Sequence, residues 1–351
     1  MITFSPGPSK VYDALPKYLQ EAYDSGILSA SHRSAAFMNL YKETETLMQE
    51  KLHVPEGYKL LFTSSATENW EIITQSIVQE AGFHIFSGSF GKKWFEYAEH
   101  INSKTEALKI DANETIDVEK LQVGNEFDVI AITQNETSNA TQVKNETIAD
   151  IADKFPEKMI AVDTTSSMGG IELDFSLADI WYASVQKCFG LPAGLGVLLL
   201  SPKAIEKIRD KGERGHYNSL NFMLENAAIY QTHYTPNVLG IYLLNRVLKD
   251  MPEIQHVDEL IKERMQKLEY TVAMTSKLKL LIENEASRSS TVLAISGSEE
   301  FITSVKKAAE REGMQMGGGY GPLKPTSFRI ANFPAITDAD FDKLINFLKQ
   351  Y

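Results

Sequence analysis

Residues 180–200 read Ile180-Trp-Tyr-Ala-Ser-Val-Gln-Lys187-Cys-Phe-Gly-Leu-Pro-Ala-Gly-Leu-Gly-Val-Leu-Leu-Leu200, two apolar runs on either side of one lysine. Small residues, glycines and a proline separate the runs, which predicts two strands joined by a tight, irregular loop. A lysine held in such a loop has little access to water, so its pKa should fall and its neutral amine should be available as a nucleophile. Surface lysines are common in loops, however, and on these residues alone that alternative stays open.

Length and composition limit the class of protein. With 351 residues the chain favours two domains over one simple core. A hydrophobic content of 43% and a charged content of 23% are ordinary for a soluble globular protein, and the net charge of -12 disfavours a nucleic-acid-binding protein. The single cysteine, Cys188, rules out an intramolecular disulfide and a cysteine-based metal site, so we expect a cytoplasmic protein without a metal centre. No stretch resembles a signal peptide or a membrane span.

Short apolar segments alternate with helical patterns along the first part of the chain. The predicted strands are Lys59–Thr63, His84–Ser87, Lys104–Asp111, Asp128–Thr133, Met159–Asp163 and the two runs around Lys187. This alternation predicts an α/β fold with a mostly parallel, doubly wound sheet. Ligands of such sheets bind beyond the carboxyl ends of the strands. Five residues that follow predicted strand ends should therefore converge: Thr67, Phe90, Thr137, Asp163 and Lys187.

The rest of the chain predicts a smaller second domain of α+β type, with helices over 254–276, 299–312 and 338–351. We place the first domain at residues 1–250, with an extended lead-in at 1–15, and the second at 251–351. Two irregular segments are expected: a polar, aromatic-rich excursion from Gly215 to Asn237, and a flexible loop from Met316 to Pro322.

A hydroxyl-rich turn, Ser64-Ser-Ala-Thr-Glu-Asn-Trp70, lies between the strand at 59–63 and a helix expected over 71–80. The first amides of a helix have no partners within it, so this turn predicts a phosphate site. A simple helix cap is the alternative.

An aspartate that ends one strand and a lysine that follows the next are the two residues that pyridoxal phosphate requires. The lysine binds the cofactor covalently, and the aspartate keeps the pyridine nitrogen protonated so that the ring can accept electrons. Asp163 and Lys187 have this arrangement, one strand-helix-strand unit apart.

Several further motifs, in the same order, resemble those of the class V aminotransferases of fold type I, and most closely those of the phosphoserine aminotransferases. They are Phe4-Ser-Pro-Gly-Pro8, Ser31-His-Arg33, Asn135-Glu-Thr137, Asp163 with Ser166-Ser167, Ala183-Ser-Val-Gln-Lys187 with Pro192-Ala-Gly194, and Arg329. The resemblance implies a fold type I transferase with pyridoxal 5'-phosphate as its cofactor, an amino acid and a 2-oxo acid as substrates, and a homodimer with shared active sites.

The resemblance also implies a role for individual residues. Lys187 would be the Schiff-base lysine, Asp163 the partner of the pyridine nitrogen, Thr137 the partner of the phenolic oxygen, and Phe90 the ring that stacks on the cofactor. The cofactor phosphate would be bound by Ala66, Thr67, Gln186 and, from the neighbouring subunit, Thr235. Arg329 would bind the substrate α-carboxylate as a bidentate fork, and His32 and Arg33 would bind the phosphate of phosphoserine.

Departures from the family pattern leave the substrate open. The phosphoserine enzymes often have a His-Arg pair shortly before the carboxylate-binding arginine, but this chain has Gly317-Gly-Gly-Tyr-Gly-Pro-Leu-Lys324 there. Lys324 is then the only cation of this segment. The segment is more similar to that of the alanine-glyoxylate and serine-pyruvate aminotransferases. A phosphoserine aminotransferase of serine biosynthesis is the first expectation and an alanine- or serine-glyoxylate enzyme the alternative. Three other classes fit the sequence less well. A cysteine desulfurase would need a mobile thiolate, and a nicotinamide dehydrogenase would need a glycine fingerprint between a strand and a helix. A non-catalytic cofactor binder would have no need of the carboxylate clamp expected at Arg329.

Overall fold

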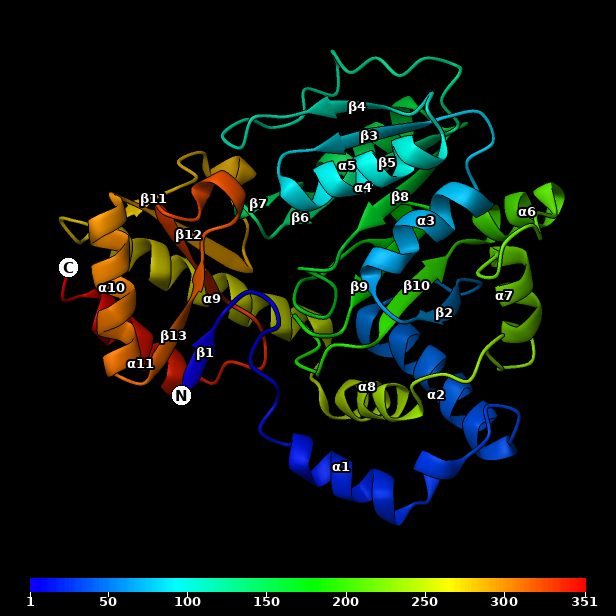
Figure 1. The fold of residues 1–351 in the computed structure, drawn as a ribbon, viewed down its shortest axis with the longest axis horizontal. Helices are drawn as coiled ribbons and strands as arrows, with labels where there is room; N and C mark the ends of the chain where they lie inside the picture. The colour runs from blue at the N-terminus through cyan, green and yellow to red at the C-terminus, as the bar shows by residue number, and fades with distance from the viewer.

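The computed structural model describes residues 1–351 as two main sheets and a two-stranded sheet of β6 (Asn135–Glu136) and β7 (Thr141–Gln142), with helices packed around them (Figure 1). The larger sheet has the strand order β2-β10-β9-β8-β5-β3-β4. Its strands are β2 (Lys59–Thr63), β10 (Gly196–Leu200), β9 (Ile180–Ser184), β8 (Met159–Asp163), β5 (Val129–Thr133), β3 (Gly82–Phe86) and β4 (Glu106–Lys109). β10 runs antiparallel to both of its neighbours, β2 and β9, and all other pairs in this sheet are parallel. The predicted α/β fold with a mostly parallel sheet is confirmed.

Helices cover the larger sheet and explain why its central strands are apolar throughout. Every residue of β8 and β9 is buried, as expected for parallel strands that are covered on both faces. Helix α3 (Ala66–Ser76) packs against β2, β9 and β10, and α4 (Ser89–Ile101) packs against β3, β4 and β5. The other helices of this part are α1 (Leu15–Asp24), α2 (Ala35–Leu52), α5 (Asn145–Lys154), α6 (Pro202–Lys211), α7 (Leu220–Ala227) and α8 (Val238–Asp250).

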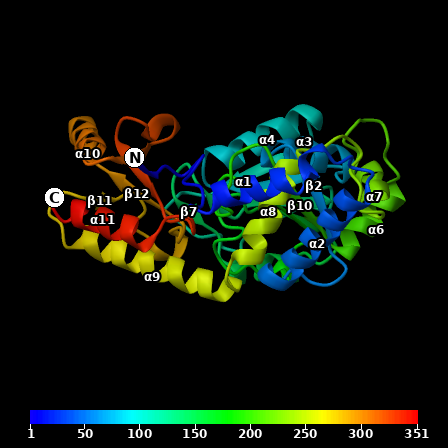
Figure 2. The same ribbon diagram turned by 90° about the horizontal axis from the view of Figure 1, so that it is seen from below.

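The smaller sheet contains the first strand of the chain. Its order is β1 (Ile2–Phe4), β13 (Met314–Gly318), β14 (Ser327–Ala331), β12 (Val292–Ser296) and β11 (Lys279–Leu280). β1 pairs parallel with β13, and the other pairs are antiparallel. Helices α9 (Ile254–Ala273), α10 (Glu299–Arg311) and α11 (Asp338–Leu348) complete this part, and both termini lie at its end of the molecule (Figures 1 and 2).

Helix α9 connects two separate apolar cores. Ile254, Val257 and Ile261 in its first half belong to the core of the larger sheet, whereas Met265 and Leu268 in its second half belong to the core of the smaller one. Figure 2 shows α9 extending from the smaller sheet toward α8. The predicted division at residue 250 precedes this helix and stays a prediction. The lead-in assigned to the first domain differs from the structure in one respect, because residues 2–4 form a strand of the smaller sheet.

Three predicted segments differ from the structure. Helix α3 begins at Ala66 and not at residue 71, because the Ser65 side chain accepts a hydrogen bond from the Glu68 amide and caps the helix there. The expected excursion over 215–237 contains α7, which buries Leu220, Met223, Leu224 and Ala227. Strand β13 extends to Gly318, so part of the expected flexible loop is paired with β14.

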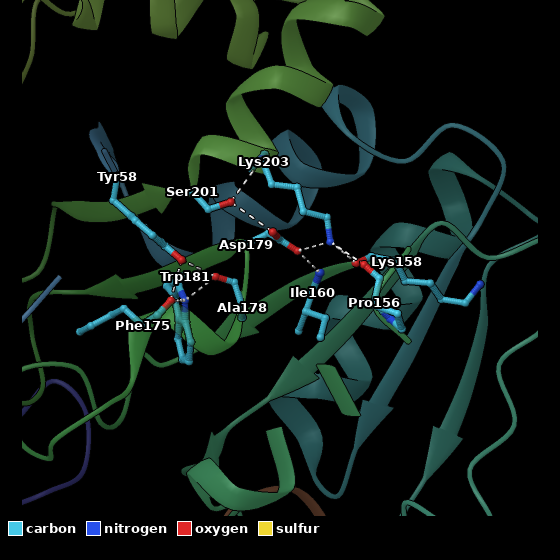
Figure 3. Close-up of polar contacts among 11 residues, drawn as sticks. Tyr58, Pro156, Lys158, Ile160, Phe175, Ala178, Asp179, Trp181, Ser201 and Lys203 are labelled. Carbon is cyan, nitrogen blue, oxygen red and sulfur yellow. Dashed lines mark hydrogen bonds and ion pairs between the residues drawn. The ribbon is translucent and has the colours of Figure 1, made fainter. Parts of the chain in front are cut away.

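A network of buried polar groups closes the amino ends of β8 and β9 (Figure 3). The Asp179 carboxylate accepts hydrogen bonds from the Ile160 amide at 3.0 Å and the Ser201 hydroxyl at 3.2 Å, and Lys203 lies 3.5 Å away. Beside it, the Trp181 indole N–H donates to the Ala178 carbonyl at 3.1 Å. These contacts satisfy main-chain groups at the amino ends of the strands, and the residues of the predicted site lie at the carboxyl ends.

No helix of the structure is long and apolar enough to cross a membrane. No cluster of His, Cys, Asp or Glu side chains is arranged to hold a metal ion.

Candidate active site

A cavity of about 230 Å³ lies at the carboxyl ends of β5, β8 and β9. It is lined by Pro6, Gly7, Pro8, Ala66, Thr67, Trp70, Phe90, Thr133, Asn135, Thr137, Asp163, Thr165, Ser166, Ser184, Gln186, Lys187, Tyr320 and Arg329. Both sheets contribute, because Arg329 lies on β14 and the segment 6–8 follows β1. The position agrees with the rule that parallel α/β sheets bind ligands beyond their carboxyl ends.

Lys187 follows β9 and places its amine inside this cavity. Its Nζ donates to the Thr137 hydroxyl at 2.6 Å and to the Ser166 hydroxyl at 2.8 Å, and these two hydroxyls also bond each other. Burial lowers the pKa of Lys187 to about 8, although the charges of Asp163 and Glu136 act in the opposite direction. A substantial fraction of this amine is therefore neutral near pH 8, as a nucleophilic lysine requires.

The N-terminal segment covers the lysine. A side chain at Gly7 would come within 3.2 Å of the Lys187 Cε, and Gly7 has a φ of +154°. Ser9 ties this segment to the lysine loop, because its amide and hydroxyl donate to the Gln186 carbonyl at 3.1 and 2.9 Å. The Pro-Gly-Pro segment thus forms one wall of the cavity and limits the access of water to the amine.

Asp163 ends β8 with its carboxylate buried in the cavity wall. Burial raises the pKa of Asp163, while hydrogen bonds from Thr165 and the charge of Lys187 lower it. The Thr165 amide donates to Oδ1 at 2.9 Å. A buried carboxylate of this kind is best stabilised by a cationic partner, such as a protonated ring nitrogen.

The N-terminus of α3 faces the cavity through Ala66 and Thr67. The Ala66 amide donates to the Ser184 hydroxyl at 2.6 Å, so a strand-end hydroxyl and the first helical amide meet at one point. Gln186 lines the same cavity. Helix amides together with hydroxyl and amide side chains are typical of a phosphate site.

Glu136 fixes the start of α4 and with it the Phe90 ring. Its buried carboxylate accepts from the amides of Phe90 and Gly91 at 3.0 Å each and from the Ser138 amide at 2.9 Å. The Phe90 ring centre lies 5.2 Å from the Lys187 Nζ and 5.0 Å from the Tyr320 ring centre. The aromatic wall of the cavity is thus positioned by a carboxylate that does not line it.

Arg329 has the geometry of a carboxylate clamp. Its Nε donates to the Gly318 carbonyl at 2.8 Å, its Nη1 donates to the Thr137 carbonyl at 2.7 Å, and its Nη2 makes no hydrogen bond within the chain. Burial lowers the pKa of Arg329. Because the ordinary pKa of arginine is far above neutral pH, the side chain remains charged. Two main-chain carbonyls therefore hold a guanidinium that keeps donors available for a ligand.

The structure brings eight of the predicted site residues to one cavity: Lys187, Ala66, Thr67, Phe90, Thr137, Asp163, Gln186 and Arg329. Thr235, His32 and Arg33 do not line it. Thr235 and Arg33 are exposed, between α7 and α8 and before α2. Burial and the adjacent Arg33 charge lower the pKa of His32, which favours the neutral imidazole. The roles of all eleven residues stay predictions.

Three residues of the site were not assigned a role from the sequence. Ser166 bonds the lysine amine, Glu136 holds the Phe90 segment, and Tyr320 adds a ring next to Phe90 and Arg329. Ser166 and Glu136 lie inside the quoted motifs, where a carboxylate among buried residues could have indicated a structural anchor. Tyr320 carries no comparable sequence signal.

Cys188 is the cysteine that a desulfurase would require. It is buried, its thiol donates to the Ser166 carbonyl at 3.3 Å, and burial raises the pKa of the thiol. A buried thiol of high pKa does not provide a mobile thiolate.

The residues of the cavity fit pyridoxal phosphate. A buried lysine amine suits its aldehyde, a buried carboxylate suits its ring nitrogen, and a helix N-terminus suits its phosphate. Among the lining residues, the Trp70 indole nitrogen and the Thr133 hydroxyl are buried without a hydrogen-bond partner within the chain. Buried polar atoms of this kind are expected where a ligand completes the site.

Comparison with known proteins gives consistent results. The family model "Aminotransferase class-V" matches residues 4–331. A phosphoserine aminotransferase from Nocardioides sp. is 27% identical over 350 residues, which cover 97% of this chain and 92% of the relative. The crystal structure of a phosphoserine aminotransferase from Cytophaga hutchinsonii is similar, with a TM-score of 0.94, 33% identity and coverage of 99% of this chain and 98% of that one. An alanine-glyoxylate aminotransferase from Nostoc sp. shares the fold, with a TM-score of 0.83, 20% identity and coverage of 99% and 94%.

Proposed function

The chain belongs to the class V aminotransferase family, and from that premise we propose that it transfers the amino group between O-phosphoserine and 2-oxoglutarate. The products are 3-phosphohydroxypyruvate and glutamate. The observation that carries this proposal is the similarity to the Cytophaga hutchinsonii enzyme, which extends over 99% of the chain at 33% identity. The alanine-glyoxylate enzyme shares only 20% of its residues with the chain.

The chain is a pyridoxal-phosphate-dependent transaminase. The bound cofactor supplies an electron sink that stabilises negative charge at the substrate Cα. We assign the proton transfer at Cα to the Lys187 amine, whose lowered pKa lets it accept a proton near neutral pH. Asp163 would keep the ring nitrogen protonated, and the Thr137 hydroxyl, which lies 2.6 Å from the Lys187 amine, would donate a hydrogen bond to the phenolic oxygen.

Arg329 orients the substrate in this proposal. The guanidinium binds the α-carboxylate with the donors left free by the Gly318 and Thr137 carbonyls. The hydrogen bond from Arg329 to the Thr137 carbonyl fixes the carboxylate clamp relative to the hydroxyl beside Lys187. This places Cα near the amine that removes its proton.

The site is completed by a second copy of the chain in this proposal. Ala66, Thr67 and Gln186 bind the cofactor phosphate, and Thr235 of the second copy adds a hydroxyl. His32 and Arg33 are also outside the cavity of their own chain, so they bind the substrate phosphate only across a dimer interface. A two-fold arrangement completes both sites at once.

A specific observation favours the second candidate, an alanine- or serine-glyoxylate aminotransferase. The segment before Arg329 has Tyr320 at the cavity, and Lys324 is exposed and does not line it. The cavity wall on that side therefore has no His-Arg pair to bind a phosphate.

The deciding experiment measures kcat/KM of the holoenzyme for phosphoserine with 2-oxoglutarate, and for alanine and serine with glyoxylate. We expect phosphoserine to be preferred at least tenfold, since one charge-assisted hydrogen bond contributes about 1.5–3 kcal/mol. A preference for alanine or serine with glyoxylate would assign the chain to the second candidate.

A further inference from the structure

We infer that Lys93, held by Tyr320, is a specificity-determining residue that binds the side-chain anion of the substrate at the rim of the cavity. The inference rests on the proposed function and deepens it. It assigns the anion site to a cation of the same chain, in addition to any cation from a second copy.

The position of Lys93 is set by residues of the cavity wall. Its Nζ donates to the Tyr320 hydroxyl at 2.8 Å, and lies 5.4 Å from the Tyr320 ring centre and 5.9 Å from that of Phe90. Tyr320 and Phe90 both line the cavity, whereas Lys93 lies just outside it. The ammonium group therefore lies at the edge of two rings that form the substrate side of the site.

Two cations lie close to the Tyr320 ring. The Arg329 guanidinium carbon is 5.7 Å from its centre, on the carboxylate-binding side, and the Lys93 Nζ is 5.4 Å from it. A substrate that places its α-carboxylate on Arg329 and extends along Tyr320 brings a terminal anion to Lys93. Alanine, which has no such group, cannot use this cation.

Lys93 has no carboxylate partner in the chain, in contrast to its neighbour. Lys92 forms an ion pair with Glu96 at 2.9 Å, one turn further along α4. The partner of Lys93 is the Tyr320 hydroxyl, and this hydrogen bond raises the pKa of Lys93, so the amine is charged at neutral pH. An unpaired cation beside a ligand cavity can form a charge-assisted hydrogen bond with an incoming anion.

The anion has two possible sources, the phosphate of phosphoserine and the γ-carboxylate of glutamate. Both carry negative charge at the end of the side chain, and both pass through the same site in the proposed reaction. Half-reactions of the holoenzyme with each amino acid alone separate them, with alanine as the neutral reference.

The test compares the parent with Lys93→Ala, Lys93→Arg and the matched control Lys92→Ala, after thermal unfolding has shown that each is folded. We expect Lys93→Ala to lower kcat/KM about tenfold or more for phosphoserine and for glutamate, with less than a twofold change for alanine. Lys93→Arg should recover most of the loss, and Lys92→Ala should match the parent. An equal loss on all three amino acids, or no loss on either anionic one, overturns the inference.

A binding measurement gives a readout that does not depend on turnover. Calorimetry with 3-phosphoglycerate, which has the carboxylate and phosphate but no amine, should show a dissociation constant about tenfold higher for Lys93→Ala than for Lys92→Ala. Equal constants for these two variants contradict the inference. If the parent prefers alanine with glyoxylate, the proposed function fails, and the glutamate and calorimetric results still decide the role of Lys93.

Discussion

Replacing Glu136 by glutamine should loosen the aromatic wall of the active site. The Glu136 carboxylate is buried and accepts three main-chain amides at 2.9–3.0 Å. A glutamine oxygen can keep the two bonds to Phe90 and Gly91, but its NH₂ group then faces the Ser138 amide, so one bond is lost and a buried donor is left unpaired. Each of these effects costs about 1–3 kcal/mol, and we expect a total loss of about 3 kcal/mol in the free energy of unfolding.

The measurement is thermal unfolding of holoenzyme variants, in which a loss of this size lowers Tm by several degrees. The matched control is Glu68→Gln, because the Glu68 carboxylate also accepts a main-chain amide, that of Ser64 at 2.6 Å, but is only half-buried, in the first turn of α3. Its effect should stay within about 1 kcal/mol, as is usual for polar groups near the surface. Equal Tm values for Glu136→Gln and the parent would refute the anchoring argument, as would an equally large loss in Glu68→Gln.

Four further predictions concern the chemistry and the assembly. Lys187→Ala should abolish turnover while Tm stays near that of the parent, because no neighbouring amine can replace it as base; an appreciable remaining rate in a coupled transaminase assay removes Lys187 from this role. The pKa of Lys187 is lowered to about 8, so the rate at which cofactor-free enzyme captures pyridoxal phosphate should rise about fivefold from pH 7 to pH 8 and less than twofold from pH 8 to pH 9. Stopped-flow absorbance measures this rate. A rate that keeps rising tenfold per pH unit up to pH 10 indicates an unshifted lysine. Arg33→Ala should lower kcat/KM about tenfold for phosphoserine and leave that for alanine unchanged; an equal loss on both contradicts a phosphate-binding role. Light scattering at assay concentration should show a dimer, and an active monomer would disprove the shared site.

The sequence predicted best those strands whose signal is local. Lys59–Thr63 and Met159–Asp163 have the predicted bounds, because a short apolar run of three or four residues flanked by polar residues is typical of a buried strand. The convergence of Asp163 and Lys187 at the cavity followed from topology alone, since parallel strands present their carboxyl ends at one edge.

Features that depend on distant partners could not be predicted in this way. Strand β1 is three residues long and is a strand only because β13 lies beside it, so no periodicity within residues 2–4 indicates it. The same holds for Glu136, which acts as an anchor only because α4 begins above it. Conversely, His32 and Arg33 form a conspicuous pair in the sequence, yet within their own chain they do not reach the cavity.

The pairing of β1 with β13 bears on how the protein is made. Ile2 leaves the ribosome before its partner Met314, which follows about 300 residues later, and this interval takes roughly 15–60 s at synthesis rates of 5–20 residues per second. During this time the segment that covers Lys187 has no anchor on the smaller sheet, and the lysine pocket stays open on that side. The wall of the active site is therefore complete only after β13 has emerged, so nascent chains should acquire a fully protected lysine late.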